Sequence, residues 1–577
     1  MKQERFLLTN FKIISYFKIN NKKEGKMTKK IINKVNNLIL VTLVACFVIS
    51  ILTTGKVLAS SKHGGALIIG VPGSQKNLNS AIYPKTFSGQ LISINLFDGL
   101  LRVSKMGDGK LTPMLAKSWD VSSDGKTITL NLRDDVNWHD GKKFTSEDVK
   151  YGILNICRPH HPQGKNNYSI VDSIETPGPY KAIIKLSKSD ATFLTKLDSK
   201  WCSMAPKHIL EGQDIPNSNY NNAPIGTGPF KFVEWKKGNY ILFERNKDYW
   251  AKASNGDQLP YLDKLYFKIL PNKTSLISSL EAGEIDFIHS YPGYLAGKEI
   301  SRVNDADNGI KVHSFAYANM AFDFIYMNTK GKFTGNKKVR QALAHLINTD
   351  EIIDKVFAGV ADNVRNKDQG FISWYTGEAP SKYFPYDVSK AEALLDSAGF
   401  KKDANGNRFK ISIIHEQKNS NHPKVLDIMR SNLKAAGIEL DVMKMDASAI
   451  TEKVHKKMDY DMYITTIATG PDPDLLTKSW HSKNIGKGWN ANSSGYNNKK
   501  IDDLLDKGRG ELDPVKRKQM YVEAHQILAE DLPMLALYGT KWLWTYNEKL
   551  DGFPIGYTFR DGLETVNWNG DIPNNRK

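Results

Sequence analysis

The sequence predicts a mixed α/β fold that is divided into about three domains. The chain has 577 residues, which is too many for one hydrophobic core, because domains usually hold roughly 100–200 residues. Alternating apolar residues, typical of strands, are interspersed along the chain with the three-to-four-residue apolar spacing of helices. With 40% hydrophobic and 25% charged residues, the composition is that of a globular protein.

The first 59 residues form a candidate secretory signal peptide. Lys29, Lys30 and Lys34 precede an apolar run at residues 38–52, and Val57-Leu58-Ala59 then supplies a cleavage-site region that ends in a small residue. This order of basic, apolar and small-residue regions directs export. The run of 15 residues is shorter than the roughly 20 that a membrane-spanning helix needs. We therefore expect cleavage after Ala59 and an exported protein, with Met27 as an alternative start.

Cys46 allows a competing interpretation, because Leu43-Val44-Ala45-Cys46 resembles a lipid-attachment site. The apolar run continues beyond Cys46, so the cysteine lies inside the run and not after it. We therefore expect cleavage, with a lipid anchor at Cys46 as the alternative. Cys157 and Cys202 would remain after cleavage, and in an oxidising compartment they form either a disulfide or two separate buried thiols.

The mature part begins with a short buried strand at 67–71, followed by a compact unit at 115–149. In this unit, alternating apolar residues predict a strand at 127–132, and two Asp-Gly dipeptides predict turns. Thr145 and Asp148 then provide the cap and the acidic partner of a helix start. The residues on which these predictions rest are Leu67, Ile68, Ile69, Val71, Asp124, Gly125, Ile128, Leu130, Leu132, Asp140 and Gly141.

A hairpin is predicted at 222–250 and three helices further on. Gly226 and Gly228 precede the first arm of the hairpin, and Lys237-Gly238-Asn239 forms its turn. Each helix has an apolar face with helical spacing, and the last begins at Asp513-Pro514 with an N-cap and a proline. The apolar faces comprise Val339, Ala342, Leu343 and Leu346; Ala391, Leu394, Leu395 and Ala398; and Tyr521, Ala524, Ile527 and Leu528.

The net charge of +18 invites a nucleic-acid interpretation, but its distribution argues against one. Residues 1–59 alone carry 11 Lys/Arg and 2 Asp/Glu, which is half of the net charge. The rest is spread thinly, without a basic stripe or a nucleic-acid motif. We therefore expect no nucleic-acid partner.

Several motifs, in order along the chain, resemble those of the family 5 extracellular solute-binding proteins, the peptide- and nickel-type binding components of bacterial ABC importers. The resemblance covers almost all of the mature chain. It rests on residues 115–149, Pro224-Ile225-Gly226-Thr227-Gly228-Pro229-Phe230, Tyr249-Trp250, Gly283-Glu284-Ile285-Asp286, Val339-Arg340-Gln341-Ala342-Leu343, Tyr386-Asp387 with Ala391-Glu392-Ala393-Leu394-Leu395, and Asp472-Pro473.

The resemblance implies a two-lobed periplasmic-binding-protein fold of type II, in its large three-domain subclass, with a central cleft and a hinge. Ligands would lie between the lobes. Domain I would be discontinuous, domain II would be an insertion, and domain III would be the second lobe. The expected boundaries are 1–59 for the signal peptide, 60–105, 223–315 and 533–577 for domain I, 106–222 for domain II and 316–532 for domain III.

In peptide-binding members, an aspartate just before the Asp-Pro motif commonly binds the peptide's α-ammonium. Here Thr469 stands at that position, followed by Gly470, and threonine supplies no charge. Asp472 or Asp474 could take over this role, the ligand could lack a free amino terminus there, or both aspartates could be turn and cap residues beside Pro473. Other cleft candidates implied by the family layout are Tyr83, Phe87, Ser88, Trp480 and Trp489, with a place in the core as the alternative for each tryptophan.

We expect neither a catalytic site nor a metal site. Motifs for a nucleophile elbow, a zinc protease or a phosphate loop are missing from the sequence. His160 and His161 are adjacent, so their side chains would point to opposite faces of an extended segment, and the prolines beside them indicate an exposed loop.

The resemblance implies the substrate-binding subunit of an ABC importer, which captures peptides or peptide-like solutes and delivers them to the permease. Its partners would be the solute and the permease and ATPase subunits, with no cofactor, and we expect a monomer. The alternative is the same role for a nickel chelate, haem, opine or oligosaccharide. A remote alternative is an exported hydrolase.

Overall fold

The computed structural model divides the chain into two units, residues 1–61 and 62–577, and every residue that it describes lies in the second unit. The expected signal peptide and Cys46 therefore lie outside the described residues. Within the described part, no helix combines the length and the apolar character needed to cross a membrane. The described residues are 62–82, 87–103, 110–199, 201, 203–289, 294–295, 299, 302–303, 309–315, 321–365, 384–468, 472–488, 491–540, 542–553 and 562–577.

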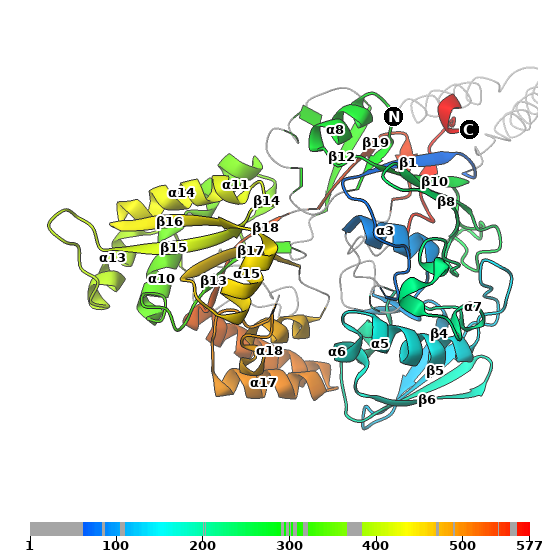
Figure 1. Cartoon of the computed structure of the whole chain (residues 1–577), viewed down its shortest axis with the longest axis horizontal. Coiled ribbons are helices and arrows are strands. Elements are labelled where there is room, and N and C mark those ends of the chain that lie inside the picture. The colour runs from blue at the N-terminus through cyan, green and yellow to red at the C-terminus, as the bar shows by residue number, and fades with distance from the viewer. Residues whose placement is uncertain are drawn as a thin grey trace, which may run out of the picture. The chain divides into compact units, whose positions relative to one another are not determined.

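A seven-stranded sheet is assembled from parts of the chain that are far apart in the sequence (Figure 1). Its central strand β1 (Ala66–Val71) runs parallel to β10 (Lys264–Ile269) and to β11 (Phe287–Ile288). Leu67 and Ile69 are fully buried, which confirms the strand predicted at this position. In the order β12-β19-β11-β1-β10-β9-β8, the other strands are β12 (Ile310–Phe315), β19 (Trp542–Asn547), β9 (Tyr240–Arg245) and β8 (Phe230–Lys236).

Strands β8 and β9 form the predicted hairpin, with the turn at Gly238, where φ is +78°. The two glycines before it are required by a close approach to helix α3 (Phe87–Leu96). A Cβ atom on Gly226 would lie 1.8 Å from the carbonyl oxygen of Leu96, and Gly228 donates its N–H to the same oxygen at 2.9 Å. These glycines therefore dock the hairpin on α3.

Along the chain, a four-stranded sheet comes between β1 and β8 of the seven-stranded sheet. It contains the strands of the 115–149 unit. The helix starts as predicted, with Thr145 as N-cap and its N–H donated to the Asp148 carboxylate at 2.9 Å. The sheet order is β4 (Ala116–Val121), β5 (Thr127–Leu132), β7 (Lys181–Leu186) and β6 (Val171–Gly178), and the helices around it are α4 (Ser146–Tyr151), η1 (Gly152–Cys157), α5 (Arg158–His160), α6 (Gly164–Tyr168) and α7 (Lys207–Leu210).

The prediction of an exposed loop around His160 and His161 is wrong. His160 ends helix α5, and His161 is buried, with its Nδ1 accepting the N–H of Gln163 at 3.1 Å. The helix that begins at Ser146 continues through η1 into α5, because the segment packs its apolar side chains into the core. Among the described residues, no group of three or more His, Cys, Asp or Glu side chains could hold a metal ion.

Cys157 is buried and is disulfide-bonded. Its Sγ lies 3.9 Å from the carbonyl oxygen of Ser203. Cys202 lies outside the described residues, so its pairing with Cys157 stays a prediction. The alternative of two separate thiols is wrong for Cys157.

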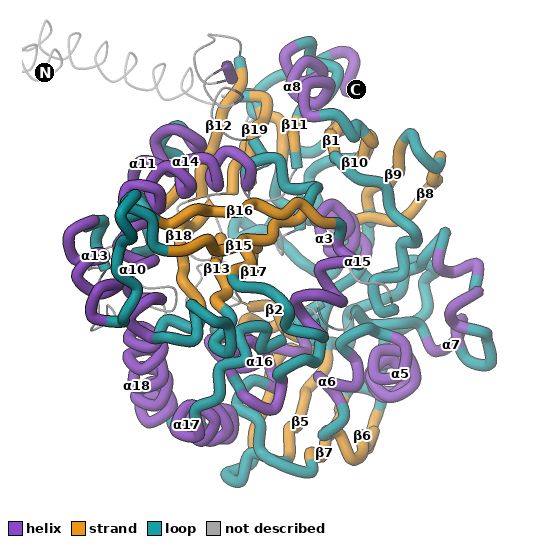
Figure 2. The backbone as a smooth tube through the Cα atoms, turned by 60° about the vertical axis from the view of Figure 1, so that its left-hand side comes forward, coloured by secondary structure: helices purple, strands orange, loops and turns teal. Residues whose placement is uncertain are grey.

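A six-stranded sheet and the helices around it form the second large core (Figure 2). The three predicted helices are present here, and Asp513 caps the last one by accepting the N–H groups of Val515 and Lys516. The sheet order is β14 (Ala361–Asp362), β18 (Met534–Thr540), β13 (Ala321–Met327), β17 (Met462–Ala468), β15 (Phe409–Glu416) and β16 (Ile438–Met445). The helices are α10 (Lys337–Leu346), α11 (Thr349–Phe357), α13 (Val388–Ser397), α14 (His422–Ala435), α15 (Ala447–Ile450), η5 (Thr451–Lys456), α17 (Lys499–Gly510) and α18 (Pro514–Asp531).

The boundary expected at residue 533, where the chain would return from domain III to domain I, is wrong in its position. Strand β18 pairs with β13 over Met534–Tyr538 and beyond, so it belongs to the six-stranded sheet. The chain passes between the two large sheets twice, from β12 to β13 and from β18 to β19. Because β12 pairs antiparallel with β19 and β13 with β18, the two passages are neighbours.

Several short elements complete the described chain. They are β2 (Leu101–Val103), β3 (Leu111–Pro113), η2 (Phe193–Leu197), η3 (Ile215–Asn217), η4 (Asn219–Asn221), α8 (Lys273–Glu281), η6 (Pro473–Leu476), α16 (Thr477–Trp480), η7 (Ser482–Asn484), β20 (Leu550–Asp551), β21 (Asn567–Trp568) and η8 (Asn574–Arg576).

Candidate ligand-binding site

The Asp-Pro motif follows β17 and begins a short helical segment. Asp472 is the N-cap of η6, and its Oδ1 accepts the N–H of Asp474 at 2.9 Å. Pro473 takes the first helical position, where its missing N–H is no loss. The sequence therefore fixes the backbone of this loop locally, with the aspartate acting as a cap.

Both aspartates of the motif are also held by arginines from neighbouring helices. Arg517 on α18 binds Asp472 with two N–H groups, at 2.8 and 2.7 Å. Arg509 on α17 donates Nε and Nη2 to Oδ2 of Asp474 at 2.9 and 2.8 Å. The hydroxyl of Thr477 donates to the other oxygen of Asp474 at 2.7 Å. Each carboxylate is thus neutralised by a cation of this chain.

The Asp474 carboxylate favours the charged form of Arg509. Burial works against the charge on Arg509, but the Asp474 carboxylate, together with Asp190 and Tyr521, raises the pKa of Arg509 overall. An ammonium group that approached Asp474 would have to compete with this guanidinium, which is bound through two N–H groups.

A cavity of about 580 Å³ opens beside these ion pairs. One wall comes from residues between Gln163 and Trp201, and the other from residues between Asp472 and Arg509. Helix α6 contributes to the first wall, and α16 and α17 contribute to the second. The size lies within the roughly 300–1,000 Å³ of small-molecule sites.

Direct hydrogen bonds join the two walls at the edge of this cavity. The N–H of Ala191 donates to the carbonyl oxygen of Arg509 at 2.9 Å, and the hydroxyl of Ser189 donates to that of Gly510 at 3.1 Å. The end of α17 is therefore fixed against the segment that follows β7. This contact sets the distance between the two walls.

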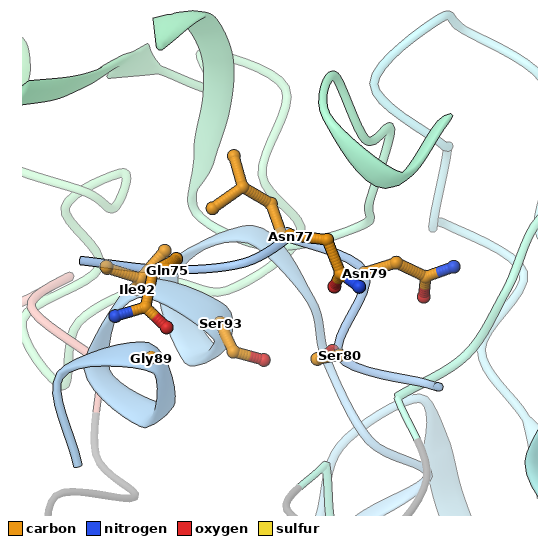
Figure 3. A pocket seen from close by; sticks show the side chains of 8 residues that line it. Gln75, Asn77, Asn79, Ser80, Gly89, Ile92 and Ser93 are labelled. Atoms are coloured by element: carbon orange, nitrogen blue, oxygen red, sulfur yellow. The ribbon is translucent and has the colours of Figure 1, made fainter. Parts of the chain in front are cut away.

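A much smaller polar pocket follows β1 (Figure 3). It is lined by Asn77 and Ser80 from the segment after the strand and by Ser93 from α3, among others. The buried Oγ of Ser93 and Oδ1 of Asn77 have no hydrogen-bond partner among the described residues. Its volume of about 10 Å³ matches a single water molecule, so it is too small for a solute.

The structure places the remaining predicted site residues in different surroundings. Trp480 ends α16 and is buried in a core cluster of the second large core. Ser88 lies in α3 and is buried. Phe87 begins that helix, and its side chain is outside the description. Tyr83, Thr469, Gly470 and Trp489 lie outside the described residues.

Sequence reasoning missed the cations that surround Asp472 and Asp474. Arg509 and Arg517 are 35 and 45 residues away from their partners along the chain, so no local spacing indicates the pairs. Lys478 follows the motif closely, but nothing in a single lysine of α16 indicates that it lines a cavity.

Comparison with known proteins identifies relatives along most of the chain. Residues 110–487 match the family described as "Bacterial extracellular solute-binding proteins, family 5 Middle". The oligopeptide-binding protein AppA of Bacillus subtilis (strain 168) is 28% identical over 512 residues, which are 85% of this chain and 89% of AppA. The glutathione-binding protein GsiB of Pectobacterium atrosepticum is 27% identical over 81% of this chain and 87% of its own.

The same likeness extends to solved structures. The structure of NikZ from Campylobacter jejuni in complex with Ni(L-His) is 26% identical and superposes with a TM-score of 0.71, covering 88% of this chain and 99% of NikZ. The two-lobed fold and the solute-binding role expected from the motifs are therefore confirmed at the level of the family. The chain belongs to the bacterial extracellular solute-binding proteins of family 5.

Proposed function

We propose that this chain captures peptides or peptide-like solutes outside the inner membrane and delivers them to the permease of an ABC importer. The observation that carries this proposal is the similarity to an oligopeptide-binding protein over 85% of the chain. The partners are the solute and the permease and ATPase subunits, and the protein acts as a periplasmic monomer without catalysis.

The connections between the two large sheets support a mechanism of opening and closing. The chain crosses between these sheets after β12 and after β18, and the described strands on either side of the two crossings pair with one another. A few residues at such passages can absorb the rotation of one lobe against the other. Ligand binding would then favour the closed form, and the permease would recognise that form.

The domain division is part of the proposal, with one boundary moved. The seven-stranded sheet represents domain I, the four-stranded sheet domain II and the six-stranded sheet domain III. Domain III then extends to Thr540, the end of β18, and domain I resumes at β19.

The proposed ligand contacts are those predicted from the sequence, with a changed role for the aspartates. Asp472 and Asp474 are each bound by an arginine. We therefore propose that they position Arg517 and Arg509 and do not bind an ammonium group of the ligand. Tyr83, Phe87, Ser88, Thr469, Gly470 and Trp489 remain proposed contacts, whereas Trp480 is assigned to the core.

Identification of the bound solute tests this function. Protein produced from the full-length gene is purified without denaturation, and the small molecules released on denaturation are identified by mass spectrometry. Melting temperatures are then measured with the released compounds and with short peptides. A ligand at 100 times its Kd stabilises the folded form by about 2.7 kcal/mol, which is readily measured.

Short peptides in the released fraction that also raise the melting temperature would support the peptide importer. A metal chelate, haem, opine or sugar as the stabilising compound would keep the importer and replace its substrate. Turnover of a substrate by the pure protein would contradict a binding function.

A further inference from the structure

The cavity beside the Asp-Pro motif carries more positive charge than its own acids can neutralise. Six of its lining residues are cationic, and three are acidic. Each acid already has its own cation within the chain: Asp190 pairs with Lys196 at 2.6 Å, Asp472 with Arg517 at 2.7 Å and Asp474 with Arg509 at 2.8 Å.

Three of the cavity's lysines have no such neutralising partner. Lys483 pairs with Asp506 outside the cavity lining, at 2.7 Å. Lys188, Lys478 and Lys487 make no side-chain hydrogen bond or ion pair within the described part of the chain. The cavity therefore offers an excess of cationic donors to whatever enters it.

Lys478 differs from the other two lysines because it is half-buried, whereas Lys188 and Lys487 are exposed. Its position is fixed by its neighbours in α16: Thr477 donates a hydrogen bond to Asp474, and Trp480 is anchored in the core. Burial lowers the pKa of Lys478, and no acidic group opposes this effect. A half-buried cation without a counter-ion lowers the stability of the fold, so a bound anion would relieve its desolvation.

We propose that this cavity is an anion subsite of the ligand-binding site, in which Lys478 binds a carboxylate of the solute, with Lys188 and Lys487 adding attraction from the rim. The proposal rests on the proposed function and narrows it to peptides or peptide-like solutes that present a carboxylate. The carboxylate comes either from the carboxyl terminus of a peptide or from an acidic side chain. Lysine is suited to both, because its ammonium donates in three directions.

The test measures binding by isothermal titration calorimetry with four probes. These are tetra-alanine as the free acid, its carboxyl-terminal amide, an amidated tetrapeptide with one internal glutamate, and glutarate. The protein is compared with two variants, Lys478→Gln and Lys507→Gln. Lys507 is the matched control, because it is exposed on α17 and does not line the cavity.

We expect the Lys478→Gln variant to lose about tenfold in affinity for every probe that carries a carboxylate, the usual size for one hydrogen bond between charged groups. The carboxyl-terminal amide of tetra-alanine, which carries no carboxylate, should bind the original protein and this variant equally. Lys507→Gln should behave like the original protein. The melting temperature of the unliganded Lys478→Gln variant should not fall, because the substitution removes an unpaired, half-buried charge.

The panel distinguishes the two sources of the carboxylate. Preference for the free acid over its amide assigns the carboxyl terminus, and rescue of the amide by an internal glutamate assigns a side chain; both support the subsite. Equal binding of the free acid, its carboxyl-terminal amide and the glutamate-containing amide, or equal losses in both variants, overturns it.

A failure of the proposed function gives a different result. If no peptide binds, the peptide importer is contradicted, and the subsite is judged by glutarate alone. Glutarate binding that disappears in Lys478→Gln then supports an anion subsite for another solute. Absence of glutarate binding overturns the subsite as well.

Discussion

At the scale of single residues, several positions of the matched motifs act by joining distant segments through buried polar contacts. Tyr249 and Trp250 both donate to the carboxylate of Asp98, at 3.2 and 3.1 Å. Burial raises the pKa of Asp98 to about 6, and Arg102 and the two donors only partly offset this effect. His139 in the 115–149 unit makes similar contacts with the glycines before the hairpin. These residues support the fold.

His139 should make the protein less stable in acid. Its Nδ1 accepts the N–H of Gly226 at 3.1 Å, and its Nε2 lies 3.0 Å from the carbonyl oxygen of Gly228. Burial lowers the pKa of His139 to about 4, below the 6.5 of the unfolded chain. The neutral His139 side chain therefore contributes its full stabilisation of the folded protein above pH 6.5, and this contribution is lost as the pH falls towards 4.

The measurement compares the free energy of unfolding at pH 7.5 and pH 4.5 for the original protein and for His139→Asn. Asparagine keeps a donor and an acceptor but does not titrate. We expect the original protein to lose about 2 kcal/mol more than the variant over this range. An identical pH dependence of both proteins would show that His139 titrates normally.

Arg517 should be essential for the stability of the Asp-Pro loop. Its side chain is 8% exposed and that of Asp472 is 14% exposed, so this ion pair is largely buried. In Arg517→Met, the Asp472 charge stays buried without its partner, which typically costs about 3–5 kcal/mol. We expect a loss of this size in the free energy of unfolding, measured by denaturant titration.

Two further variants test whether the loss comes from the pair. Asp472→Asn combined with Arg517→Met should recover part of the stability, because no unpaired charge remains. Lys516→Met, on the exposed neighbour of Arg517, should change stability by less than about 0.5 kcal/mol. An additive double variant would exclude coupling between the two side chains.

At the scale of elements, the close approach of the hairpin segment to α3 decides the structure around the pocket after β1. Gly226 and Gly228 contact Leu96 at the end of α3, and the same helix provides Gly89, Ile92 and Ser93 to that pocket. The position of α3 therefore depends on two residues that are more than 120 positions further along the chain.

Gly226→Ala should disrupt this docking. The new Cβ would lie 1.8 Å from a backbone oxygen, which cannot move without shifting the end of α3. We expect a destabilisation of about 3 kcal/mol, the upper end of the usual cost of overpacking. Gly178→Ala is the matched control, because nothing lies within 4 Å of its added Cβ and its φ is not positive. Equal melting temperatures of both variants would show that the hairpin and α3 adjust freely.

At the scale of the whole described chain, the segment η8 at residues 574–576 is held against the seven-stranded sheet. Arg576 donates Nε to the carboxylate of Asp286 at 2.7 Å and Nη2 to the carbonyl oxygen of Gly283 at 2.7 Å. The same carboxylate oxygen accepts the N–H of Ile68 in β1 at 2.9 Å. Three distant parts of the chain, at its start, middle and end, therefore meet at one buried ion pair.

Removal of this contact should weaken the whole sheet. Arg576→Ala leaves Asp286, which is 2% exposed, without its cation, and we expect a loss of about 3–5 kcal/mol in the free energy of unfolding. Lys577→Ala, at the exposed next position, should have an effect below about 0.5 kcal/mol. If both variants unfold at the same denaturant concentration, the end of the chain does not contribute to the sheet.

The sequence by itself determined the local elements and the family. The strand at β1, the hairpin β8–β9, the Thr145 cap and the helices α10, α13 and α18 all follow from periodicity, turn dipeptides and capping residues, which act over a few positions. The motif order was sufficient for the family, since each motif depends on local chemistry.

Only the tertiary structure decided which sheet β18 joins and what surrounds Asp472 and Asp474. Strand pairing and ion pairs between residues tens of positions apart depend on packing, and no local pattern encodes them. For the same reason, the sequence presented the two aspartates as candidates for an ammonium group. The fold instead neutralises them with arginines, and Lys478 is half-buried in the cavity without a counter-ion among the residues that the structure describes.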